Sequence, residues 1–236
     1  MNEFILADMA TERLTREIGM VAKPLPKEIK VLQKDLPSGK VRYESALYQS
    51  EKLKKIAVSK RSNGRGGVGT TVMLISRDEY DFPFVLVDLA FSFFKEHSIS
   101  SGFHLRPLVK DEESQKRYIE PFKAWREAIG KLPGETITLD LGPFMKANPP
   151  PLKYVCSLPD SYLDEVLKYI NHFFDILLDV YRKVEPVKDA RRRKKIDNFR
   201  AEYNQKIFGD DYSGKVLIET FGPQIAALFY DYFVYL

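Results

Sequence analysis

The sequence predicts a single α+β domain over residues 1–236, in which helices cover an antiparallel sheet. Short runs rich in β-branched and aromatic residues dominate the first half of the chain, and each is bounded by Gly, Pro, Asn or Asp. The last third instead carries apolar residues at helical spacing. Consecutive strands joined by short loops favour antiparallel pairing, and the helices that follow them are expected to cover the sheet.

The first half opens with an amphipathic helix, which we expect at about residues 3–18. Strand-like runs follow, and we expect strands at residues 28–33, 41–48, 53–59, 70–76, 84–91 and 102–108. Residues 64–69 match the dinucleotide-binding fingerprint by letter, but that motif requires a helix after the glycines. The run that follows is β-branched, so the glycines predict a hairpin loop.

The second half is mainly helical. A charged helix is expected at residues 111–132, started or kinked by Pro121. A strand pair is expected at residues 136–141 and 152–157, separated by three consecutive prolines. Apolar residues from Leu163 to Tyr181 predict a long helix with Asp160 as its N-cap. Another helix is expected at residues 189–208, ending at Gly209, and two short helices close the chain.

Composition excludes several classes of function. Apolar residues make up 44% and charged residues 30% of the 236, as in soluble globular proteins with one core. One cysteine rules out a disulfide framework, a thiolate zinc site and a protein-held iron–sulfur cluster, and the three histidines share no metal-ligand spacing. A net charge of +4 falls short of a nucleic-acid-binding footprint. No segment reads as a membrane span or a signal peptide, so a cytoplasmic location is expected.

Asp88 is the most informative acid in the sequence. It lies inside a run, residues 82–91, that is apolar on both faces, as expected for a strand covered on both sides. A carboxyl group there loses hydration and is expected to hold a proton at neutral pH, as a proton donor must. The alternative is a structural aspartate that reaches solvent or a backbone partner at the end of the strand.

Other polar residues have simpler interpretations. Asp211 lies with Asp210 between Gly209 and Ser213, so by itself it reads as a turn or N-cap residue. His104 alternates with apolar neighbours on a strand, which favours a structural histidine. Basic residues gather at 52–65 and 191–195, where they form either a solvated surface or a docking site for an acidic partner. RNA binding would require aromatic residues interleaved with the basic ones, and the aromatics here follow core periodicities instead.

Five blocks of sequence carry a family resemblance. They are YQSEKLKK at 48–55, YDFPFVLVD at 80–88, HLRPL at 104–108, YIEP at 118–121 and DYSGKVLIETFG at 211–222. In order and spacing they resemble the ferredoxin-dependent bilin reductases, the family of phycocyanobilin, phycoerythrobilin and phytochromobilin synthases. The resemblance covers about residues 40–236.

The resemblance implies a three-layer α/β/α sandwich that holds an open-chain tetrapyrrole between the sheet and the C-terminal helices. It implies reduction of biliverdin IXα to a phytobilin through substrate radicals, with electrons arriving singly from reduced ferredoxin and with no bound metal or flavin. Asp88 and Asp211 fall on the family's catalytic aspartates. Ferredoxins are acidic, so Lys52, Lys54, Lys55 and Arg192 are predicted to bind the partner. We expect a monomer that binds neither nucleic acid nor membranes.

Four further residues are predicted to contact the substrate: Ser59, Thr71, His104 and Arg106. Three of them depart from the family pattern. Phycocyanobilin-forming members carry Glu in place of Ser59 and His in place of Thr71, where others carry Asn, and many members carry Asp in place of His104. A frequent Arg is missing near Val155. These departures leave the product isomer open. They also motivate an alternative, a non-catalytic tetrapyrrole-binding protein on the same fold, and a third hypothesis is a basic module that binds RNA or protein.

Overall fold

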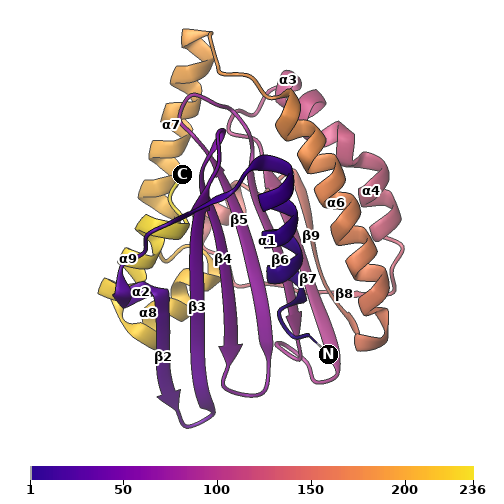
Figure 1. Cartoon of the computed structure of the whole chain (residues 1–236), viewed down its shortest axis with the longest axis vertical. Coiled ribbons are helices and arrows are strands. Elements are labelled where there is room, and N and C mark those ends of the chain that lie inside the picture. Colours follow the sequence, from indigo (N-terminus) through magenta and orange to yellow (C-terminus); the bar gives the residue numbers. More distant parts are fainter. Residues whose placement is uncertain (1) are drawn as a thin grey trace.

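A computed structural model describes residues 2–236 and arranges them in three layers, a sheet between two groups of helices (Figure 1). The strands are β1 (Val21–Lys23), β2 (Val31–Leu36), β3 (Gly39–Gln49), β4 (Leu53–Asn63), β5 (Val68–Ser76), β6 (Phe84–Phe91), β7 (Ser98–Arg106), β8 (Glu135–Thr136) and β9 (Leu152–Pro159). They pair in the order β1-β3-β4-β5-β6-β7-β9-β8, with β2 also paired to β3, and every pairing is antiparallel. The expected α/β/α sandwich with an antiparallel sheet is therefore confirmed.

Each face of the sheet packs against its own helices. The longer ones are α1 (Ile5–Ile18), α4 (Lys123–Ile129), α6 (Leu163–Lys183), α7 (Ala190–Ile207), α8 (Tyr212–Phe221) and α9 (Pro223–Phe233). One apolar cluster joins the sheet to α1, α4 and α6, while a second joins the opposite face to α7, α8 and α9. Alternate residues of β5 enter different clusters, Val72 the first and Met73 the second, because successive strand side chains point to opposite faces.

Two expected strands are wrong in part. Residues 27–30 form a short helix, α2 (Lys27–Lys30), and β2 begins only at Val31. Only Thr136 of the expected strand at 136–141 lies within a strand, β8. The chain then leaves the sheet and continues into α5 (Pro143–Ala147), where the Asp210 carboxylate accepts a hydrogen bond of 2.7 Å from the Met145 amide. The two residues in this contact are 65 positions apart in the sequence, so no local sequence pattern predicts it.

The expected helix at residues 111–132 is broken. It consists of α3 (Glu112–Ser114), a π-helical turn at Gln115–Ile119, a 3-10 turn at Glu120–Phe122 and α4. Pro121 lies in the 3-10 turn and has no amide hydrogen to donate to the preceding turn, which accounts for the break. Asp160 begins a 3-10 turn instead of capping α6, whereas Asp189 caps α7 through its side chain. Residues 64–67 turn between β4 and β5, as predicted. No helix within residues 2–236 combines the length and apolar character needed to cross a membrane.

Candidate functional site

Four polar side chains form a row across the sheet. Ser45 on β3 pairs in register with Ser59 on β4, Ser59 with Thr71 on β5, and Thr71 with Asp88 on β6. Residues paired in register on neighbouring antiparallel strands lie on the same face of the sheet. The strands thus bring together three residues that the sequence singled out, Ser59, Thr71 and Asp88, on the face that packs against α7, α8 and α9.

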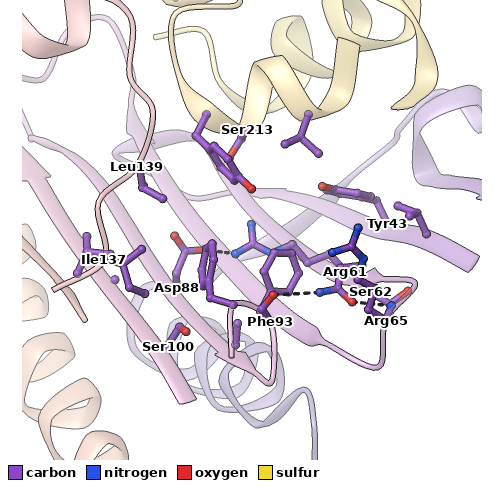
Figure 2. Close-up of a pocket in the computed structure, with 18 of the residues that line it drawn as sticks. Tyr43, Arg61, Ser62, Arg65, Asp88, Phe93, Ser100, Ile137, Leu139 and Ser213 are labelled. Carbon is purple, nitrogen blue, oxygen red and sulfur yellow. Dashed lines mark hydrogen bonds and ion pairs between the residues drawn. The ribbon is translucent and has the colours of Figure 1, made fainter. Parts of the chain in front are cut away.

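Two adjoining cavities lie over this row. One of about 380 Å³ extends toward the hairpin turns, and one of about 120 Å³ lies beneath α8 and α9. Both have Arg61, Asp88 and His104 in their walls, so they form one continuous site between the sheet and the C-terminal helices. Figure 2 shows Asp88 and Arg61 on the sheet side of the larger cavity, with Leu139 and Ser213 across from them.

Asp88 enters the cavity as part of an ion pair. Its Oδ1 accepts hydrogen bonds from Arg61 Nη2, at 3.2 Å, and from the Thr71 hydroxyl. The side chain of Asp88 is 25% exposed and pairs with Arg61. The expectation of wholly apolar surroundings is therefore wrong. Both hydrogen bonds end on Oδ1, and no group of residues 2–236 donates to Asp88 Oδ2. One oxygen is fixed, and the other is available to a ligand.

Asp211 faces the smaller cavity from the N-terminus of α8. It is the N-cap residue, and its Oδ1 accepts a 3.1 Å hydrogen bond from the Gly214 amide and another from the Tyr230 hydroxyl. The N-cap interpretation is confirmed. Burial raises the pKa of Asp211, while the hydrogen bonds from Tyr230 and Gly214 act in the opposite direction. Asp211 is thus a desolvated carboxyl group held in one orientation, with its Oδ2 without a donor among residues 2–236.

His104 lines both cavities from β7. Burial lowers its pKa to about 3, with further lowering by the positive charges of Lys153 and Arg106. The imidazole is therefore neutral at physiological pH. Its Nε2 is buried and has no hydrogen-bond partner among residues 2–236, so a polar group of a ligand could satisfy it.

Arg106 and Ser59 differ in how they relate to the cavity. Arg106 is 2% exposed and contacts two wall residues, Met145 through its sulfur at 3.8 Å and Tyr203 through its ring at 5.9 Å, without lining the cavity itself. Burial lowers its pKa. Ser59 lines the smaller cavity and exchanges a 2.8 Å hydrogen bond with Ser45. Substrate contact by these residues stays a prediction.

The cationic groups predicted to bind a partner all make contacts within the chain. Lys52 donates to the carbonyls of Tyr181, Arg182 and Val184 at the C-terminal end of α6. Lys54 pairs with Asp78 at 2.6 Å, and Lys55 donates to the carbonyls of Asp231 and Tyr235. Arg192 is 12% exposed and donates to Asp81, Asp111, Glu113 and Ser114. Their binding to ferredoxin stays a prediction, but each has a structural role that the sequence did not reveal.

Sequence reasoning missed two residues that hold the aspartates, Arg61 and Tyr230. The sequence pattern places Arg61 in the basic cluster at 52–65, although its position two residues after Ser59 on one strand puts both side chains on the same face. Its guanidinium also lies 4.9 Å from the centre of the Phe93 ring. Tyr230 gave no comparable signal, because it lies 19 residues from Asp211 on another helix. Within residues 2–236, no cluster of three or more His, Cys, Asp or Glu could hold a metal ion.

A cavity lined by two anchored carboxyl groups between a sheet and C-terminal helices defines an α/β/α ligand-binding protein with acid–base capacity. The sequence profile described as ferredoxin-dependent bilin reductase matches residues 7–235. The chain therefore belongs to the ferredoxin-dependent bilin reductases, a family of oxidoreductases, as the sequence blocks predicted.

The fold has solved counterparts. One is described as the crystal structure of SeMet-phytochromobilin synthase from tomato in complex with biliverdin, with a TM-score of 0.76 and 14% sequence identity. The alignment covers 95% of this chain and 79% of that one. At this identity the likeness establishes the fold. No curated protein sequence matches the chain.

Proposed function

We propose that the protein reduces biliverdin IXα to a phytobilin, taking electrons one at a time from reduced ferredoxin through substrate radicals. The reduction of one double bond consumes two electrons, supplied by two molecules of reduced ferredoxin, and two protons. The proposal needs no flavin or metal, because the tetrapyrrole itself carries the unpaired electron between the two steps. Family membership supports the reaction class, and the observation that carries the proposal is the pair of carboxyl groups in the cavity.

The cavity suits such a substrate in size and position. Its larger part, about 380 Å³, falls in the range of small-molecule sites and opens into a second part beneath α8 and α9. The walls combine aromatic and aliphatic side chains with polar and charged groups, which suits a flat conjugated ligand that carries polar substituents. His104 offers an unsatisfied nitrogen there.

The two aspartates have different surroundings, which suggests different roles. Asp211 is half-buried, and loss of hydration raises its pKa, so it is suited to hold a proton and to donate it through Oδ2. Asp88 lies in an ion pair and is suited to act as a carboxylate that accepts hydrogen bonds from pyrrole N–H groups and stabilises positive charge on the protonated bilin. Both residues would contact the substrate, so both are proposed as catalytic.

The test is anaerobic single-turnover reduction. Biliverdin is added to the protein, an absorption spectrum reports binding, and reduced ferredoxin then starts a reaction followed by absorbance and electron spin resonance. The wild-type protein is expected to bind the bilin, to form a transient radical and to convert it. Binding without reduction would instead favour the non-catalytic tetrapyrrole-binding protein, and the absence of binding would refute both.

Isosteric variants then assign the aspartates. Asp211→Asn and Asp88→Asn preserve the shape of the side chain and the hydrogen bonds that Oδ1 accepts, so both variants should still bind biliverdin. General acid catalysis is worth about 10²–10⁴-fold, and Asp211→Asn is expected to lose about that much in reduction rate. Asp88→Asn removes a charge that stabilises the transition state, and a loss of about 10²–10³-fold is expected there. Asp140→Asn is the control, because Asp140 is an exposed carboxylate paired with Lys215 outside both cavities. A loss of only about twofold in either cavity variant would mean that its carboxyl group is structural.

A further inference from the structure

Asp211 is held by a hydroxyl group that the family resemblance did not assign. Tyr230 on α9 is fully buried, and its hydroxyl donates to Asp211 Oδ1. The ring is fixed by edge contacts with Phe208, at 5.2 Å between ring centres, and with Tyr235, at 5.8 Å. Because the donor cannot move away, the carboxyl group of Asp211 cannot turn within the cavity.

Gly214 is a second, independent observation that supports the contact between Tyr230 and Asp211. A Cβ at position 214 would lie 2.3 Å from the Tyr230 hydroxyl and 2.7 Å from Asp211 Oδ1. Such distances exclude a side chain, so the glycine leaves room for the tyrosine to reach the carboxyl group. The amide of the same glycine donates to the same Oδ1. Two helices thus meet at one oxygen atom and leave the other for the substrate.

We propose that Tyr230 is a positioning residue that fixes Asp211 and sets how tightly Asp211 holds its transferable proton. The proposal rests on the proposed function, in which Asp211 is the proton donor. A hydrogen bond donated to a carboxylate stabilises its charged form and opposes the effect of burial. Tyr230 can play this part throughout the physiological range, because burial and the neighbouring Asp211 raise the pKa of its own hydroxyl.

The direction of the expected effect follows from the charge states. The acid form of Asp211 donates, so the reduction rate should fall as pH rises through the pKa of Asp211. Tyr230→Phe removes a stabiliser of the carboxylate and therefore raises that pKa. The alkaline limb of the rate profile should then move to higher pH by about one unit, a tenfold change in proton affinity.

Other ionisable groups face Asp211 and stay in place in this variant. They are Asp210 and Tyr212 beside it, Tyr203 on α7, and Tyr43, Arg61, Asp88 and His104 on the sheet. Their common contribution cancels when two variants are compared. The matched control is Tyr235→Phe, because Tyr235 also packs on the Tyr230 ring but lines neither cavity. It should leave the rate profile where it is.

The experiment measures Asp211 in two ways. The pH dependence of single-turnover reduction is recorded for the wild type, Tyr230→Phe and Tyr235→Phe. In parallel, the titration of the Asp211 carboxyl group is followed by infrared difference spectroscopy on the bilin-free protein, with Asp211→Asn as the reference that lacks the band. Equilibrium unfolding of each variant verifies that the ring packing has survived.

The outcomes separate the two proposals. A shift of both the infrared titration and the rate profile toward higher pH in Tyr230→Phe supports the role of Tyr230. An unshifted infrared titration overturns it, whatever the rates are. A shifted titration with an unshifted rate profile keeps the link between Tyr230 and Asp211 but refutes Asp211 as the donor. If the wild type does not reduce biliverdin at all, the proposed function fails, while the infrared titration still decides the role of Tyr230.

Discussion

Replacing Arg192 with alanine tests whether this basic residue serves the fold or a partner. The sequence predicts a docking role, but the side chain is 12% exposed and makes hydrogen bonds in several directions. Nε donates to Asp81 at 2.7 Å, and Nη2 donates to the Ser114 hydroxyl at 2.9 Å. Nη1 donates to Asp111 at 3.2 Å and to Glu113 at 3.1 Å. We therefore expect Arg192→Ala to act mainly on stability.

The magnitude follows from the burial of each partner. Asp81 is 1% exposed, and removing one member of a buried ion pair costs about 3–5 kcal/mol. Asp81 keeps the Tyr118 hydroxyl and a longer contact of 3.6 Å to Arg117, so the lower end applies. The pairs with the more exposed Asp111 and Glu113 add about 0–1 kcal/mol. A loss of about 3 kcal/mol corresponds to a fall in Tm of about 6–12 °C for a domain of this size.

The assay is urea unfolding, with Arg191→Ala as the control. Arg191 is the exposed neighbour of Arg192 and has no ion pair within residues 2–236, so its loss should change stability by less than about 0.5 kcal/mol. The KM for ferredoxin is measured in parallel at a temperature where both variants are folded. Wild-type stability in Arg192→Ala, together with a raised KM, would refute the structural reasoning and restore the docking role.

Turnover is expected to fall as ionic strength rises through about 0.1 M, where the Debye length is about 10 Å, because an acidic ferredoxin is steered by positive charge; rates that stay constant with added salt contradict this. Lys54→Glu, at a partly exposed lysine paired with Asp78, should raise the KM for ferredoxin without changing how biliverdin binds, and an unchanged KM removes Lys54 from the interface. The product is expected to keep the outer vinyl group, because hydroxyls stand at Ser59 and Thr71 where phycocyanobilin-forming relatives carry titratable groups. Phycocyanobilin as the main product by chromatography would overturn that expectation.

The fold was readable from the sequence wherever local pattern and final packing agree. The apolar run over residues 84–91 became β6, and the helical stripe between Leu163 and Tyr181 became α6. Both are buried against the sheet layers, so the residues that set local periodicity also set the packing. The expected strand at 136–141 is formed only at Thr136, because the residues after it leave the sheet and lead to α5. The first turn of α5 donates a hydrogen bond to Asp210, which lies 65 residues from Met145 in the sequence. Sequence periodicity contains no information about such a contact.

The candidate site was readable only in part, for a similar reason. Asp88 and Asp211 could be named from the sequence, but their electrostatic surroundings could not. The partner of Asp88 comes from β4 and that of Asp211 from α9, and both depend on strand register or helix docking. The same limit applies to the basic clusters. Lys52 and Arg192 look like surface charges in the sequence, yet the carbonyls and carboxylates that hold them lie 79 to 132 residues away along the chain.

The row of side chains across the sheet also constrains the chemistry of the cavity. Ser59, Thr71 and Asp88 occupy consecutive register positions, so a flat ligand lying along the row would meet two hydroxyls and one carboxyl group. Hydroxyls donate and accept hydrogen bonds but do not titrate near neutral pH. Acid–base capacity is therefore concentrated at Asp88, at one end of this row, and at Asp211 beneath α8. A bilin bound over the row would therefore exchange protons with the two carboxyl groups, and Ser59 and Thr71 would contribute hydrogen bonds alone.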